Sequence, residues 1–302
     1  MHLSIDSPIS KVLQGVFNVY RDRVSDVQKI TNALVSQGIV GGQSEILNDH
    51  IAFRTLGVPH LGIASFEKIF LAHGYEKRDY FFFEGKKLNA YWYAPPQDEL
   101  PRIFISELRV ADLSDRAQQL IAKYTKEITA DPVDALDLQN VEAVTEFFHR
   151  PLWQLPSLED YNELLAESEY AAWVIYNRYY LNHYTISVHQ LDGAHRTLEQ
   201  FNEFLKSIGI KLNNSGGEIK VSPDGLLRQS SSVAEKVEAT FAGNKTATIA
   251  GSYVEFAERL PLPEYAHLPF TEIKRHMRRD GFESGNADKI FESTFTTQTQ
   301  RN

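Results

Sequence analysis

The sequence predicts an α+β fold in which two similar β-α-β-β-β modules form one curved mixed sheet. A strand-like stretch, a helix and three further strand-like stretches follow one another over residues 49–111, and the same order returns over residues 181–260. Because identity between the two stretches is low, the duplication is inferred from the order of elements. Helical segments are expected over residues 1–48, 112–180 and 261–302, so we treat residues 1–302 as a single domain with these additions.

The composition indicates a globular chain with a sizeable core. The 302 residues are 42% hydrophobic and 12% aromatic, and the net charge is −9 without a basic cluster, so nucleic acid is not an expected partner. The sequence lacks an apolar run near the ~20 residues that cross a bilayer, and residues 1–30 do not resemble a signal peptide. We therefore expect a cytoplasmic protein without a membrane partner, and the sequence leaves its oligomeric state open.

The N-terminal segment and module one are marked by changes of hydrophobic period. Apolar residues fall at helical spacing from Ile9 to Val35, and Gly41 and Gly42 end this pattern. A strand is then predicted over residues 49–55, followed by a helix that ends at Gly74. Three strand-like stretches complete the module, over residues 77–83, 87–93 and 102–110.

The segment between the modules, residues 112–180, is expected to form helices. Breaks are predicted at Asp131-Pro132 and over residues 151–156, where prolines interrupt the pattern. Its many aromatic side chains are expected to build a core and not a ligand site.

Module two repeats the order of module one. A strand over residues 183–189 precedes a helix that ends at Gly209. Further strands are expected over residues 218–221, 226–233 and 246–259, and the turn Ser222–Gly225 separates the first two.

The first strand of module one carries two side chains of chemical interest. Along residues 49–55, alternation places His50, Ala52 and Arg54 on one face of the strand. His50 and Arg54 would lie ~13 Å apart along it, a span that suits a small dicarboxylate. On these two residues alone, a locally hydrogen-bonded histidine and a surface arginine are the more common roles.

A possible metal centre follows from the duplication. His50 and His183 open the first strands of the two modules, and Glu255 stands among apolar residues in the last strand of module two. The chain has no cysteine, so a metal would be held by histidine, carboxylate or water. Two histidines and one carboxylate can form a facial triad with three open positions, which favours Fe(II) and dioxygen chemistry. Alternatively, His183 is a strand-edge histidine and Glu255 pairs with Arg259.

Two further residues bear on the type of metal site. Glu107, in the last strand of module one, is the most credible fourth ligand, and a site with four protein ligands would suit an isomerase better than an oxygenase. His189 lies on the His183 face but at the strand end, where we expect a surface position.

The chain resembles the 2-oxoadipate dioxygenase/decarboxylase family, also called D-2-hydroxyglutarate synthases, from about residue 10 to 295. The resemblance is carried by Asp49–Thr55, Asn182–Thr185, Leu226–Ser231 and Gly251–Phe256. It implies a vicinal-oxygen-chelate type fold around one Fe(II), with His50, His183 and Glu255 as metal ligands.

The resemblance also implies a reaction and two substrate contacts. 2-Oxoadipate and dioxygen would give 2-hydroxyglutarate and carbon dioxide. Arg54 matches the arginine that receives the distal carboxylate of the substrate, and Gln229 is expected to contact the substrate or to support a ligand.

Three other hypotheses remain at this point. The same fold could carry a glyoxalase-like isomerase or an extradiol-type dioxygenase, or the chain could be a non-catalytic small-molecule binding protein. A hydrolase has little support, because the serines at 230–232 are not flanked by the glycines of a nucleophile elbow.

Overall fold

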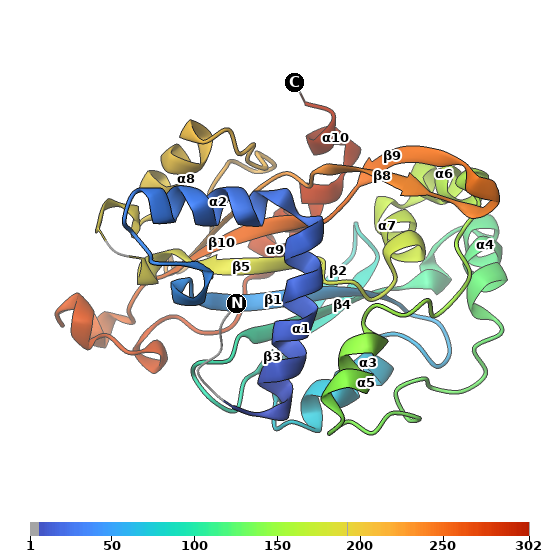
Figure 1. Cartoon of the computed structure of the whole chain (residues 1–302), viewed down its shortest axis with the longest axis horizontal. Coiled ribbons are helices and arrows are strands. Elements are labelled where there is room, and N and C mark those ends of the chain that lie inside the picture. The colour runs from blue at the N-terminus through green and yellow to red at the C-terminus, as the bar shows by residue number, and fades with distance from the viewer. Residues whose placement is uncertain (1–5, 192, 302) are drawn as a thin grey trace.

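The computed structural model describes residues 6–191 and 193–301, and its centre is a curved eight-stranded mixed sheet (Figure 1). The strands run across the sheet in the order β2-β3-β4-β1-β5-β10-β7-β6. They are β1 (Asn48–Leu56), β2 (Glu76–Phe83), β3 (Leu88–Ala94), β4 (Arg102–Leu108), β5 (His183–Ser187), β6 (Lys220–Val221), β7 (Leu227–Ser231) and β10 (Tyr253–Arg259).

The sheet order confirms the predicted pair of modules. Module one is β1, α3 (Ile63–Leu71), β2, β3 and β4, and module two is β5, α8 (Leu198–Ser207), β6, β7 and β10. In each module the first strand pairs in parallel with the last, β1 with β4 and β5 with β10. The modules join where β1 and β5 pair antiparallel. Outward from this seam the strands follow in the same order in both half-sheets, β1-β4-β3-β2 and β5-β10-β7-β6.

One capping contact recurs at equivalent places in the two modules. In module one, Glu107 of β4 accepts a hydrogen bond from the backbone N–H of Ile63 at 2.8 Å, at the start of α3. In module two, Glu258 of β10 accepts one from Leu198 N–H at 3.1 Å, at the start of α8. A carboxylate at a helix N-terminus satisfies an otherwise free N–H group and favours the helix dipole.

The strand register also defines which positions correspond. His50 of β1 lies opposite Arg102 of β4, and His183 of β5 lies opposite Tyr253 of β10. Counting two residues on along each last strand, Phe104 in module one corresponds to Glu255 in module two. The position that carries the carboxylate of one module is therefore apolar in the other.

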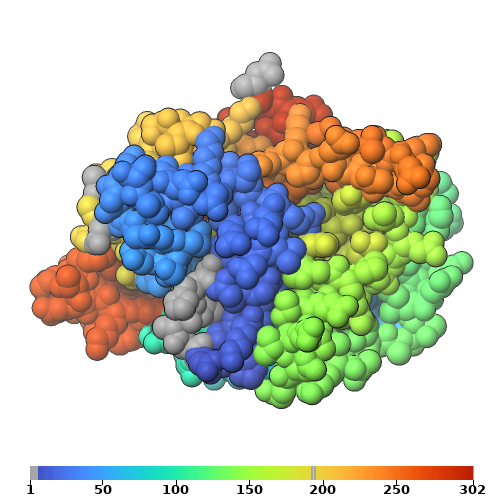
Figure 2. All heavy atoms as spheres, viewed as in Figure 1, coloured from blue at the N-terminus to red at the C-terminus, as the bar shows by residue number. Residues whose placement is uncertain are grey.

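Helices cover both faces of the sheet. On one face α1 (Pro8–Arg23) packs its Phe17 ring against Tyr184 of β5 at 5.0 Å, and Tyr20 donates a hydrogen bond to the carbonyl of Tyr253. Figure 1 shows α1 and α2 (Ser25–Ser36) crossing in front of the strands, and Figure 2 shows how completely these helices and the insertion hide the sheet from this side. On the opposite face, α9 (Ser284–Phe291) lies over His50 and its neighbours.

The insertion between the modules is helical, as predicted. Its helices are α4 (Asp115–Thr125), α5 (Val141–Phe147), α6 (Leu158–Glu167) and α7 (Glu169–Asn177). Its aromatic side chains belong to the core, in agreement with the sequence: Phe147 is fully buried and Trp173 is 2% exposed.

Three expectations about local structure were wrong. The single strand expected over residues 246–259 is divided near Gly251 into β9 (Thr246–Ala250) and β10, because β9 pairs with β8 (Lys236–Thr240) in a separate hairpin. The strand expected to reach residue 189 ends at Ser187 and continues as a 3-10 turn. Residues 261–302, expected to be helical, contain three 3-10 turns up to Met277 before α9 and the short α10 (Thr296–Thr299).

Among the described residues, 6–191 and 193–301, no helix is long and apolar enough to cross a bilayer.

Candidate metal centre

Three neighbouring strands bring His50, His183 and Glu255 together on the face covered by α9. One ligand atom from each lies within 4.8 Å of the others. Glu255 Oε2 is 3.0 Å from His183 Nε2 and 3.4 Å from His50 Nε2. Donors that take adjacent positions on one metal, each about 2.1 Å from it, are about 3 Å apart. The spacing therefore fits a shared metal ion.

The residue that precedes each histidine fixes its orientation. His50 Nδ1 lies 2.9 Å from Asp49 Oδ1, and His183 Nδ1 lies 3.1 Å from Asn182 Oδ1. Because these oxygens only accept hydrogen bonds, each Nδ1 carries a proton and each Nε2 faces Glu255; His50 Nε2 also lies 3.0 Å from the hydroxyl oxygen of Thr185. These roles of Asp49 and Asn182 were not predicted from the sequence, although the signal was present, because an aspartate or asparagine directly precedes each histidine.

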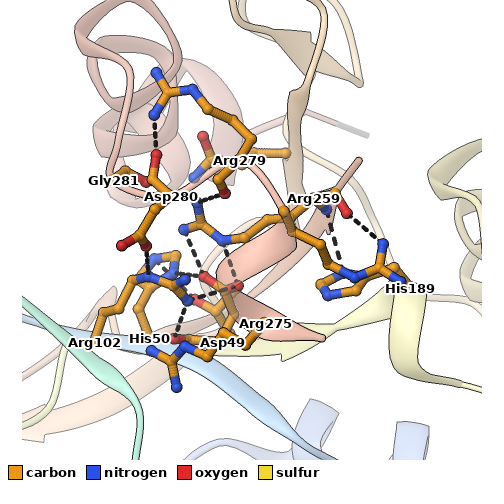
Figure 3. Close-up of polar contacts among 12 residues, drawn as sticks. Asp49, His50, Arg102, His189, Arg259, Arg275, Arg279, Asp280 and Gly281 are labelled. Carbon is orange, nitrogen blue, oxygen red and sulfur yellow. Dashed lines mark hydrogen bonds and ion pairs between the residues drawn. The ribbon is translucent and has the colours of Figure 1, made fainter. Parts of the chain in front are cut away.

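Buried arginines hold Asp49 in turn. Arg259 donates from Nε and Nη2 to the two carboxylate oxygens at 2.6 and 2.9 Å, and Arg102 Nη1 lies 3.4 Å from Oδ2 (Figure 3). Burial alone would raise the pKa of Asp49, but Arg259 and Arg102 hold that pKa well below its usual value. Asp49 is therefore a permanent anion behind His50, so Arg259 pairs with Asp49 and not with Glu255.

Glu255 has its own supporting chain. Its Oε1 accepts a hydrogen bond from Gln229 Nε2 at 2.7 Å, and Gln229 Oε1 accepts one from Asn286 of α9 at 3.0 Å. Burial would raise the pKa of Glu255, yet the adjacent His50 and His183 hold the pKa well below its usual value. The carboxylate is thus ionised and keeps Oε2 directed at the histidines.

The donor atoms fit a metal ion. His183 Nε2 is buried and has no hydrogen-bond partner among the described residues. A buried polar atom without a partner is costly and needs an explanation, and a cation coordinated by two imidazoles and a carboxylate supplies one.

The space beside the triad is small and largely apolar. A cavity of about 20 Å³, which is room for about one water molecule, is lined by the three candidate ligands, Gln229, Tyr253 and an apolar wall. Phe104, Phe282 and Phe291 form most of that wall, and the Phe282 ring lies 4.7 Å from the ring of His50. In this closed arrangement a six-carbon acid does not fit.

Arg54 lies on the His50 face, as predicted, but it does not line the cavity. Its guanidinium donates to Thr294 Oγ1 at 2.9 Å and to the carbonyl of Phe291 at 3.1 Å, and it packs over the rings of Tyr170 and Trp173. The side chain is only 1% exposed, and this burial lowers the pKa of Arg54. Phe291, whose carbonyl accepts from Arg54, also lines the cavity, as does Tyr253, whose ring centroid lies 4.8 Å from that of His183.

Glu107 and His189 lie elsewhere. The structure does not bring Glu107 to the candidate ligands, because it points to the other face of β4 and binds the start of α3. The surface position expected for His189 was wrong: the residue is 7% exposed, and its Nδ1 accepts a hydrogen bond from the backbone N–H of Arg259. Burial and the nearby Arg278 lower the pKa of His189 to about 3.

Paired β-α-β-β-β modules form a vicinal-oxygen-chelate type fold, and a buried His-His-Glu set near their seam is a candidate metal centre. A putative glyoxalase superfamily protein from Ralstonia eutropha has the same fold, with a TM-score of 0.71 at 22% identity over 91% of this chain and 85% of that one.

The chain belongs to the 2-oxoadipate dioxygenase/decarboxylase family, whose model matches residues 12–268. It is 45% identical over 268 residues to the chloroplastic 2-oxoadipate dioxygenase/decarboxylase of Arabidopsis thaliana, across 85% of this chain and 70% of that one. It is also similar to the crystal structure of a hydroxyglutarate synthase from Oryza sativa in complex with 2-oxoadipate, with a TM-score of 0.87 and 43% identity over 96% of this chain and 93% of that one. The Arabidopsis protein is named as chloroplastic, so a cytoplasmic location for this chain stays a prediction.

Proposed function

We propose that this chain is an Fe(II)-dependent dioxygenase that converts 2-oxoadipate and dioxygen to 2-hydroxyglutarate and carbon dioxide. The six carbons of the substrate would be divided between a five-carbon hydroxy acid and carbon dioxide, and both atoms of dioxygen would enter the products. The proposal is carried by the buried triad of His50, His183 and Glu255, in a chain 43% identical to a hydroxyglutarate synthase crystallised with 2-oxoadipate.

The nature of the donor set supports iron. Two histidines and one carboxylate with open positions are typical of non-haem Fe(II) oxygenases, and Fe(II) bound there would supply the redox chemistry with dioxygen. Asp49 and Asn182 would keep the imidazole lone pairs directed at the ion, and Gln229 would keep Glu255 in place.

The apolar position in module one favours this reaction over an isomerase. Phe104 occupies the place that corresponds to Glu255, and Glu107 serves α3 on the other face of the strand. A fourth protein ligand is thus absent from the described surroundings of the triad, which leaves positions for substrate and dioxygen.

Substrate binding would require the wall of the cavity to move. Arg54 would form charge-assisted hydrogen bonds to the distal carboxylate of the substrate, in exchange for its present bonds to Phe291 and Thr294. Displacement of Phe291 would both enlarge the cavity and expose the guanidinium. The remaining aromatic wall would keep bulk water from the reacting carbons.

The proposal is tested by oxygen uptake of anaerobically purified, Fe(II)-loaded protein with 2-oxoadipate and a panel of other 2-oxo acids. We expect oxygen consumption, carbon dioxide and 2-hydroxyglutarate in equal amounts, and none in a His183→Ala control. If metal-loaded protein consumes no oxygen with any acid of the panel, the dioxygenase assignment is wrong.

The role of Arg54 needs a separate experiment. In Arg54→Gln, kcat/KM for 2-oxoadipate should fall much more than the affinity for Fe(II), because Arg54 is no part of the metal centre. The matched comparison is a 2-oxo acid with no distal carboxylate, for which kcat/KM should differ little between the variant and the original protein. Equal loss of metal and activity would contradict the assignment.

A further inference from the structure

A second and larger cavity is lined by Asp49 and His189 but not by Glu255. It measures about 210 Å³, against about 20 Å³ beside the triad, and so has room for several waters or a small anion. Four arginines line it: Arg102, Arg259, Arg275 and Arg278. Figure 3 shows Arg102 and Arg259 around Asp49, with Arg275 beside them and His189 next to Arg259.

Acidic side chains pair with Arg102 and Arg259, but among the described residues none forms an ion pair with Arg275 or Arg278. Asp49 is already shared by Arg259 and Arg102, and Asp280 pairs with Arg102 at 2.6 Å from outside the lining. The remaining carboxylates of the lining, Asp98 and Glu99, are exposed at its mouth. Burial, together with the neighbouring Arg259 and Arg275, lowers the pKa of Arg102 to about 10, which is the expected effect of crowded positive charge.

Arg278 supplies an independent observation, because part of its buried guanidinium has no hydrogen-bond acceptor among the described residues. The residue is only 4% exposed, and its Nη1 donates to the carbonyl of Arg259 at 2.9 Å. Its Nε and Nη2 have no hydrogen-bond partner among the described residues. The carboxylate that acts on it electrostatically, Glu258, is already paired with Arg228 at 3.0 Å. A buried guanidinium with two free donors is costly unless an acceptor reaches it.

We propose that this arginine cavity is a binding site for a small oxyanion, either a carboxylate or an inorganic ion of the sulfate type. Arg278 would contribute the two free donors of its planar fork, the geometry that guanidinium groups use for carboxylates and oxyanions, and Arg275 would add a second positive charge at the half-exposed side. Since the cavity shares Arg259 and Arg102 with Asp49, a bound anion acts next to the carboxylate that orients His50. The site does not depend on the reaction proposed above.

The test is thermal unfolding of the metal-loaded protein against sodium sulfate and sodium glutarate, with sodium chloride at matched ionic strength. A specific site gives a saturable rise in unfolding temperature, because a ligand that binds only the folded state stabilises it. Sulfate also stabilises proteins non-specifically, without saturation. The matched control is therefore Arg116→Gln, which removes an exposed arginine that pairs with Glu163.

In Arg278→Gln we expect the apparent Kd to weaken about tenfold or more, because charge-assisted hydrogen bonds are lost, while Arg116→Gln behaves as the original protein. Arg275→Gln should give the same direction and serves if Arg278→Gln does not fold. Saturation with glutarate alone identifies a carboxylate site, and saturation with sulfate alone an inorganic one. Glutarate bound at Arg54 instead would raise the unfolding temperature equally in every variant. If no anion gives a saturable rise, or if all variants respond alike, the proposal is overturned.

Discussion

Replacement of Asp49 by asparagine should be the most damaging conservative change near the metal centre. Asp49 accepts two hydrogen bonds from Arg259 and one from the Nδ1–H group of His50, and it lies 3.4 Å from Arg102. The side chains of Asp49 and Arg259 are each 2% exposed. Asparagine keeps the shape and one acceptor oxygen but leaves Arg259 as a buried charge without its counter-ion. Breaking a buried pair in this way costs about 3–5 kcal/mol.

Urea unfolding of the metal-free protein at pH 7 measures this loss without a contribution from bound metal. The same variant should bind metal about 10- to 100-fold more weakly, because the group that orients His50 is impaired. Whole domains are stable by only about 5–15 kcal/mol, so the predicted loss is large enough to be measured cleanly.

A double-mutant cycle shows whether the lost charge pair is the cause. In Asp49→Asn/Arg259→Gln the unpaired charge is gone, so the combined loss should be smaller than the sum of the single losses, by about 0.5–3 kcal/mol. Restoration stays incomplete, since Arg259 also donates to the carbonyls of Arg279 and Gly281. A loss below about 1 kcal/mol in Asp49→Asn, or strictly additive effects, would refute the reasoning.

Three further predictions address other parts of the molecule. Gln229→Ala should weaken metal binding about tenfold, measured by competition with a chelator, because Glu255 loses the donor that orients it; unchanged affinity would contradict that role. Glu107→Gln should cost about 1 kcal/mol in urea unfolding as a weakened helix cap while metal content stays constant, and loss of metal would make Glu107 a ligand after all. For Asp26, burial and the neighbouring Glu235 raise the pKa from 3.8 to about 7. The folded state thus binds this proton more tightly than the unfolded state, and stability is lost as the pH rises through 7. Asp26→Asn should therefore be more stable than the original protein at pH 8 and equally stable below pH 3.8. An equal difference in the free energy of unfolding at both pH values would exclude this titration.

The sequence predicted the architecture and the three candidate ligands because both rest on patterns that are local to each strand. Alternation placed His50 and Arg54 on one face, and the repeated element order brought His183 to the equivalent strand. The pairing of Asp49 with Arg259 could not be predicted from the sequence, because the two residues are 210 positions apart and no periodicity links them. The exclusion of Glu107 likewise needed the register between β1 and β4.

The covering of the site by the C-terminal segment was also beyond sequence reasoning. The pattern predicted helices after residue 261, but it gave no indication that Phe291 would line the cavity beside the triad and accept a hydrogen bond from Arg54. The buried position of His189 was missed for a similar reason, because a strand end is usually exposed and the hydrogen bond that His189 accepts from Arg259 joins residues 70 positions apart.

The seam between β1 and β5 has a consequence for how this protein folds. Thr185 and His50 touch across it although 135 residues separate them, so closing the seam carries the loop-closure entropy of a long-range contact. A metal ion held by His50, His183 and Glu255 would take one ligand from module one and two from module two. Bound metal would therefore stabilise only the state in which the two modules are packed together. Its chief kinetic effect should be to slow the separation of the two modules during unfolding.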